Sequence, residues 1–82
     1  MYFAYILFSS KINKYYSGQT KDISKRLKEH NRGKTSFMES GRPWILVFSR
    51  EFNSRSEAIE LELFIKKRGA ARFLNDNHIL IV

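Results

Sequence analysis

The chain has 82 residues, a formal net charge of +7 and no cysteine. This length suits one small domain, which we expect to span residues 1–82. Without cysteine there is no disulfide or thiolate zinc site, and no apolar run approaches the roughly 20 residues that cross a membrane. We therefore expect a cytoplasmic protein with no membrane association, whose excess of cations favours a polyanionic partner.

The first part of the chain predicts two strands joined by a short turn. Residues 3–9 are rich in aromatic and β-branched side chains and are apolar on both faces, which is typical of a central strand. Residues 10–13 have the composition of a hairpin connection, and residues 14–17 form the returning strand. Gly18 is expected to end that strand, where the backbone needs freedom.

A helix is predicted next, over residues 22–31, with Asp22 as its N-cap and Gly33 as its stop. Arg26 and His30 are four residues apart, so both side chains lie on the same side of this helix. A permanent cation beside a titratable imidazole suits phosphate chemistry.

The second part of the chain begins with an irregular connection over residues 33–43, followed by the strongest strand, residues 44–52. Ser54 and Glu57 have the spacing of a capping box, which predicts a helix from Ser54 to about residue 68. Trp44 is expected to lie in the core.

Gly69 should break this helix, and residues 70–77 could form a last short helix before the apolar tail, residues 78–82. The expected fold is α+β, within the broad α/β class. It has a small, mainly antiparallel three-stranded sheet flanked by helices, in the order β-β-α-β-α, with a C-terminal helical or extended tail.

Glu62 breaks the pattern of its helix. The expected apolar arc contains Ala58, Ile59, Leu61, Leu63 and Ile65. Glu62 falls between Ala58 and Ile59 on that arc, and a partly buried carboxylate is costly unless it is paired or binds a metal. Two interpretations follow. Glu62 could form a salt bridge with Lys66, four residues on, or it could hold a divalent metal facing Arg26 and His30.

These residues together resemble the GIY-YIG nuclease domain, over roughly residues 3–68. Phe3-Ala4-Tyr5 and Tyr16-Ser17-Gly18 stand where that family has its two name-giving tripeptides, and they keep the tyrosines and the last glycine. The spacings from Tyr5 to Tyr16 (eleven), to Arg26 (ten more) and to His30 (four more) are those of the family. The segments GQTKD, RLKEHN and GRPW resemble its small stand-alone bacterial members.

The resemblance implies a metal-dependent endonuclease that hydrolyses DNA phosphodiester bonds. Glu62 would hold Mg²⁺ or Mn²⁺, and Arg26 would bind the scissile phosphate. Tyr5 or Tyr16 would activate the attacking water, with His30 assisting the proton transfer. A free tyrosine has a pKa near 10, so it needs nearby cations to act as a base at neutral pH.

Further nucleic-acid contacts are expected from cations around this site and from a late asparagine, for which Asn75 ranks ahead of Asn77. The candidates are Lys21, Lys25, Lys34, Arg42, Lys66 and Asn75. DNA is the expected partner, with RNA left open and no protein partner implied. Selectivity for nucleic-acid structure, as in repair or recombination, is expected more than sequence preference. The alternatives are a catalytically weak or inactive nucleic-acid-binding module of the same fold, and an interaction domain whose charge serves solubility.

Overall fold

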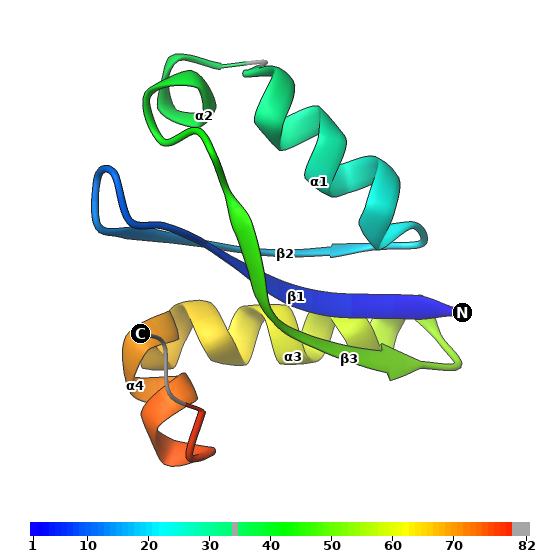
Figure 1. The fold of residues 1–82 in the computed structure, drawn as a ribbon. Coiled ribbons are helices and arrows are strands. Elements are labelled where there is room, and N and C mark those ends of the chain that lie inside the picture. Colours follow the sequence, from blue (N-terminus) through cyan, green and yellow to red (C-terminus); the bar gives the residue numbers. More distant parts are fainter. Residues whose placement is uncertain (34, 80–82) are drawn as a thin grey trace.

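The computed structural model describes residues 1–33 and 35–79 and has a three-stranded antiparallel sheet between two pairs of helices (Figure 1). The strands are β1 (Tyr2–Ser9), β2 (Lys14–Thr20) and β3 (Ile45–Phe52), in the order β2-β1-β3. The helices are α1 (Ile23–Arg32), α2 (Ser36–Ser40), α3 (Arg55–Arg68) and α4 (Ala70–Asp76). The predicted α+β fold and its element order are confirmed.

The central strand β1 is covered on both faces, as its apolar residues predicted. Tyr5 and Leu7 pack with Trp44 on the side of α1, where Ile23 and Leu27 complete the cluster. On the other face, α3 and α4 cover a second cluster, formed by Ile6, Ile65, Phe73 and Leu74. Because β1 pairs with both neighbours, its side chains are fixed in register on both faces.

Helix α1 has the caps that the sequence predicted. The Asp22 carboxylate accepts a hydrogen bond from the Lys25 backbone N–H, at 3.0 Å. Gly33 ends the helix in the left-handed region, at φ 74°, which glycine adopts without steric cost. These caps fix where α1 begins and ends, and they therefore set the direction in which Arg26 and His30 point.

The stretch expected to be irregular contains the short helix α2, capped by Thr35, whose hydroxyl accepts from the Met38 N–H. Beyond it, Trp44 is tied to α1. Asn31 accepts a hydrogen bond from the Trp44 backbone N–H at 2.7 Å and donates one to its carbonyl at 3.2 Å. The Trp44 indole N–H donates to the Met38 carbonyl at 2.9 Å. Trp44 is 2% exposed, which confirms its place in the core.

Besides the missed helix α2, two details of the sequence interpretation are wrong. Strand β2 continues through Gly18 to Thr20, because Gly18 is paired with Tyr5 on β1 rather than placed in a turn. In α3, Leu63 is 58% exposed, so it does not belong to the buried arc that contains Ala58 and Ile65.

The C-terminal part of the fold follows the prediction as far as the structure describes it. Ser54 caps α3: its hydroxyl accepts from the Glu57 N–H at 3.3 Å and donates to the Glu57 carboxylate at 2.8 Å. Helix α4 follows directly after Gly69. Of the apolar tail, Ile79 packs against the α3–α4 side of the core, and residues 80–82 lie outside the described residues.

Candidate active site

A buried pair, Tyr5 on β1 and His30 on α1, lies at the centre of the candidate site. Both side chains are 1% exposed, and the Tyr5 hydroxyl oxygen is 3.4 Å from His30 Nε2. The Tyr16 ring packs edge-on against the imidazole, with ring centroids 4.4 Å apart, and it stacks on Tyr5 at 6.4 Å. Three of the five predicted site residues therefore form one aromatic cluster.

Burial fixes the protonation states of this pair. Burial raises the pKa of Tyr5 to about 12, and the adjacent Arg26 guanidinium only partly offsets that rise. Burial, and then the charge of Arg26, lower the pKa of His30, while Glu29 acts in the opposite direction. At neutral pH, Tyr5 is therefore a protonated phenol and His30 a neutral imidazole, which can accept a proton at one ring nitrogen.

His30 also has a polar atom facing away from Tyr5. Its Nδ1 is buried and has no hydrogen-bond partner among the described residues. A buried polar atom that lacks a partner costs free energy, so its presence needs a reason, of which a catalytic role is one. This observation sets His30 apart from a core histidine held by two hydrogen bonds.

Arg26 connects this cluster to the surface. Its side chain is 40% exposed and forms an ion pair with Glu29, at 3.4 Å. Arg26 borders a hollow of about 220 Å³ that also reaches His30, and a second one, of about 320 Å³, that Lys21, Lys25 and Arg55 also line. The guanidinium is therefore placed where an anion from solvent could meet both His30 and a group of cations.

Glu62 approaches the site from α3, on the other side of the sheet. Its side chain is 16% exposed, and its Oε2 accepts a 2.7 Å hydrogen bond from Lys66. Burial is the main cause of the raised pKa of Tyr5, and the negative charge of Glu62 adds a smaller contribution, so the carboxylate lies within electrostatic range of that hydroxyl. The predicted ion pair with Lys66 is thus present, and the carboxylate also acts on the buried cluster.

Glu62 can fit a divalent metal only as a single carboxylate ligand. Among the described residues no group of three or more His, Asp or Glu side chains could hold an ion together. A hard cation such as Mg²⁺ commonly keeps several waters and takes one carboxylate plus substrate phosphate oxygens. A partly exposed carboxylate of this kind therefore fits, with Lys66 as a competing cation for the same oxygen atoms.

The other predicted contacts are dispersed. Lys21 lies over the Tyr2 ring, 5.3 Å from its centroid, and Lys25 is exposed on the first turn of α1. Arg42 is exposed and lies 3.9 Å from the Glu39 carboxylate. The prediction for Lys34 lies outside the described residues.

The two candidate asparagines lie on or just after α4. The Asn75 side chain is exposed, whereas the Asn77 amide donates a 2.8 Å hydrogen bond to the Phe73 carbonyl and so closes its own helix. Asn77 is therefore engaged locally, and Asn75 keeps its place as the candidate contact.

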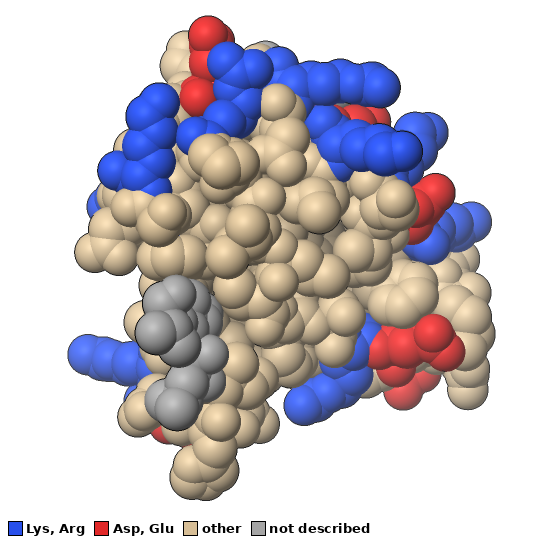
Figure 2. Space-filling view, in the orientation of Figure 1, with Lys and Arg blue, Asp and Glu red and all other residues tan. Residues whose placement is uncertain are grey.

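Sequence reasoning missed Arg55, which joins Lys21 and Lys25 around the hollow beside Arg26. Arg55 is the first residue of α3, where the positive end of the helix dipole disfavours a cation. Because a cation in that position does not stabilise the helix, its presence in the sequence was a signal that it could bind a ligand. Figure 2 shows Lys and Arg side chains gathered over the part of the molecule where α1 and α2 lie.

Comparison with known proteins identifies the family of the chain. The GIY-YIG catalytic domain matches residues 1–75, so the chain belongs to the GIY-YIG family. This membership indicates nuclease-type activity on a nucleic acid, and nucleases of this family typically use a divalent metal.

The relatives are small bacterial proteins. The chain is 37% identical to UPF0213 protein YazA of Bacillus subtilis over 67 residues, which cover 80% of this chain and 67% of YazA. It is 36% identical to UPF0213 protein SH2523 of Staphylococcus haemolyticus over 66 residues, covering 79% of each. No solved structure matches the chain. No helix within the described residues is long and apolar enough to span a bilayer.

Proposed function

We propose that this protein is a metal-dependent endonuclease that hydrolyses DNA phosphodiester bonds, and that residues 1–82 act as a single catalytic domain. The observation that carries the proposal is the cluster formed by Tyr5, Tyr16 and His30 beside the exposed guanidinium of Arg26. Glu62 adds a carboxylate within electrostatic range of Tyr5. A cation for the phosphate, a neutral imidazole and a hard oxygen ligand together suit phosphodiester hydrolysis.

Arg26 would bind the scissile phosphate. Its side chain is partly held by Glu29, so its position is restricted before any substrate arrives. A planar guanidinium can donate two parallel hydrogen bonds to phosphate oxygens and can stabilise the additional charge of a pentacovalent transition state. Glu62 would hold the divalent metal, which when bound would neutralise charge on the phosphate and leaving oxygens.

The two tyrosines would have different roles. Tyr5 is buried and its pKa is about 12, so it is unsuited to remove a proton from water at neutral pH. It would instead hold His30 in place and fix which ring nitrogen carries the proton. Tyr16 is only partly buried and contacts the imidazole. We therefore assign the contact with the attacking water to Tyr16, and the uptake of the proton from that water to neutral His30.

The alternative is an inactive nucleic-acid-binding module of the same fold. One observation favours it: Lys66 bonds to Glu62 at 2.7 Å, so the carboxylate already has a cation partner. If that ion pair persisted in the presence of Mg²⁺ and DNA, the cations around Arg26 would bind phosphate without cleavage.

Cleavage of branched, flapped and duplex DNA in Mg²⁺, Mn²⁺ or EDTA tests this proposal. The informative variant is Arg26→Ala, and its matched control is Arg32→Ala, an exposed arginine on the same helix. We expect metal-dependent cleavage by the wild type and by Arg32→Ala, reduced at least about a hundredfold in Arg26→Ala. Binding without cleavage by the wild type under every metal condition would favour the inactive module.

A further inference from the structure

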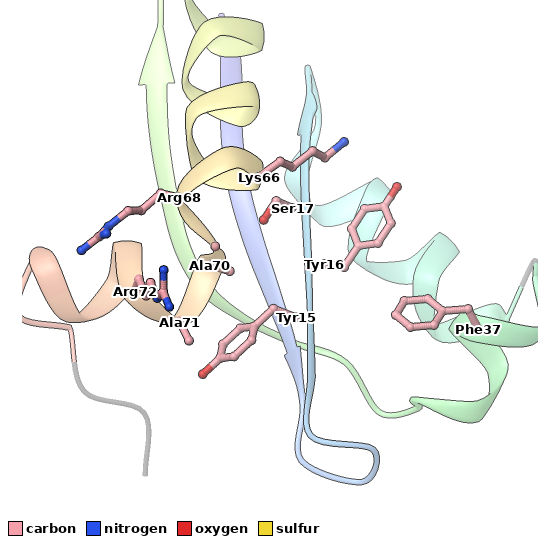
Figure 3. A pocket seen from close by; sticks show the side chains of 10 residues that line it. Tyr15, Tyr16, Ser17, Phe37, Lys66, Arg68, Ala70, Ala71 and Arg72 are labelled. Atoms are coloured by element: carbon pink, nitrogen blue, oxygen red, sulfur yellow. The ribbon is translucent and has the colours of Figure 1, made fainter.

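A hollow of about 610 Å³ lies at the outer edge of β2, beside the candidate active site (Figure 3). The sheet order β2-β1-β3 leaves β2 as an edge strand, so among the described residues no strand lies along its outer side. Part of α2 borders the hollow on one side, and the junction of α3 and α4 borders it on the other. Apart from Tyr16 and Lys66, none of the residues that line it has a role assigned above.

Aromatic rings and small side chains line this hollow. Tyr15 and Tyr16 contribute from adjacent positions of β2, and Figure 3 shows them extending to opposite sides of the strand. Phe37 extends from α2 toward β2 and is 42% exposed, although it packs against Trp44 at 5.4 Å between ring centroids. Ala70 and Ala71 leave room across from these rings. The hollow therefore offers flat, partly hydrated apolar surface.

Cations surround this apolar surface. Lys66 and Arg72 line the hollow together with Arg68, whose guanidinium is bonded to Asp76 at 2.7 and 3.0 Å. Aromatic faces within a positively charged rim are complementary to one chemical unit in particular, a nucleobase with its phosphate. The base would stack on a ring, and the cations would contact the backbone.

Two residues connect this hollow to the active site. Tyr16 lines the hollow and also packs against His30, and Lys66 lines it and also bonds to Glu62. In Figure 3 both side chains extend in the same direction from β2 and α3. A ligand in the hollow would therefore touch the same side chains that position the proposed base and the proposed metal ligand.

We propose that this hollow binds an unstacked nucleobase of the strand whose phosphodiester bond lies at Arg26. The proposal rests on the proposed function and adds a requirement to it. In an intact duplex the base is stacked and paired, so filling the hollow would first require that the base be unstacked and unpaired, which costs free energy. Strands with an unpaired nucleotide beside the cut would fill it without that cost.

Binding in EDTA tests the base pocket separately from cleavage. Fluorescence anisotropy would compare a labelled 12-nucleotide single strand of thymidines with a strand of the same length made of abasic sites. Because both carry the same phosphates, the electrostatic part of binding cancels. We expect the wild type to bind the thymidine strand about tenfold more tightly, as expected for base–aromatic stacking. Equal affinities would overturn the proposal without any variant having to fold.

The variant Phe37→Ala should lose most of the tenfold preference. Its control is Phe64→Ala, which removes a phenylalanine of similar exposure (55%) from α3, outside the hollow, and should keep the preference. A preference that survives in Phe37→Ala would contradict the pocket as defined. Cleavage in Mg²⁺ without any base preference in EDTA would overturn the pocket and leave the nuclease standing. A base preference without cleavage would support the pocket and contradict the proposed nuclease activity.

Discussion

The hydroxyl of Tyr5 lies against Gly18 on the neighbouring strand: a Cβ at Gly18 would be 2.6 Å from that oxygen and 2.8 Å from the ring carbon that bears it. Real Cβ atoms essentially never approach other atoms so closely. Gly18 therefore leaves the space in β2 that the buried Tyr5 needs. This glycine, the last residue of the tripeptide Tyr16-Ser17-Gly18, allows the Tyr5 phenol to lie beside His30.

The substitution Gly18→Ala should displace Tyr5 and destabilise the fold. We expect a loss of about 1–3 kcal/mol in the free energy of unfolding, because the core around Tyr5 has little room to adjust. Urea unfolding measures it. Adding Tyr5→Phe removes the closest atom, so the double variant should be destabilised by less than the sum of the single changes. Strictly additive losses would show that the clash is relieved elsewhere.

The stability of the fold should decrease as the pH falls through the range in which His30 becomes charged. Burial lowers the folded-state pKa of His30, so the unfolded chain binds a proton more readily. The stabilisation is fully present above the unfolded pKa of about 6.5 and is lost as pH falls from there toward the lower folded pKa. Urea midpoints at pH 8 to 5 would measure this loss, which His30→Gln should remove.

The matched control for this titration is His78→Asn, since His78 is the other histidine and is exposed. Asparagine tolerates the positive φ of 59° at this position. The control should keep the wild-type pH dependence. If His78→Asn abolished it instead, His30 would not be its source.

Tyr5 should titrate late in an alkaline absorbance titration. Because burial raises its pKa to about 12, the folded state keeps this proton longer than the unfolded chain. The corresponding stabilisation is present below pH 10 and is lost as the pH rises from about 10 toward about 12. Phenolate absorbance should contain a late component that disappears in Tyr5→Phe. If the late component remained in Tyr5→Phe, it would come from another tyrosine.

Asn31→Ala should loosen the junction between α1 and β3. The change removes two hydrogen bonds to the backbone of Trp44 and leaves its N–H and carbonyl without their partner. We expect a loss of about 1–3 kcal/mol in the free energy of unfolding, which Trp44 fluorescence in urea would follow. The exposed Asn75→Ala is the control and should leave stability within about 0.5 kcal/mol of the wild type.

The helices and strands were largely predictable because local signals set their ends. Asp22 and Gly33 cap α1 and Ser54 caps α3, as the sequence indicated. Helix α2 was missed because five residues are too few to show a helical period. Gly18 was taken for a strand end because the sequence does not reveal that a tyrosine on another strand occupies the space beside it.

The candidate site was predictable as a set of residues but not in its electrostatics. The four-residue spacing places Arg26 and His30 on one side of α1 whatever the rest of the chain does. Tyr5 is buried, whereas Tyr16 is only partly buried. This difference depends on the packing of several elements and cannot be predicted from spacings along the chain. The same is true of Arg55, which reaches the hollow beside Arg26 only after α3 has packed on the sheet.

The most direct test of the nuclease proposal is single-turnover cleavage of a labelled flapped DNA in Mg²⁺ by Glu62→Gln and Glu60→Gln. Both variants remove one carboxylate charge from α3, but Glu60 is exposed and has no role in the proposed site. We predict that Glu60→Gln cleaves at close to the wild-type rate, and that Glu62→Gln is slower by about a hundredfold or more. Equal rates in the two variants would contradict the assignment of Glu62 as the metal ligand, and with it the proposed mechanism.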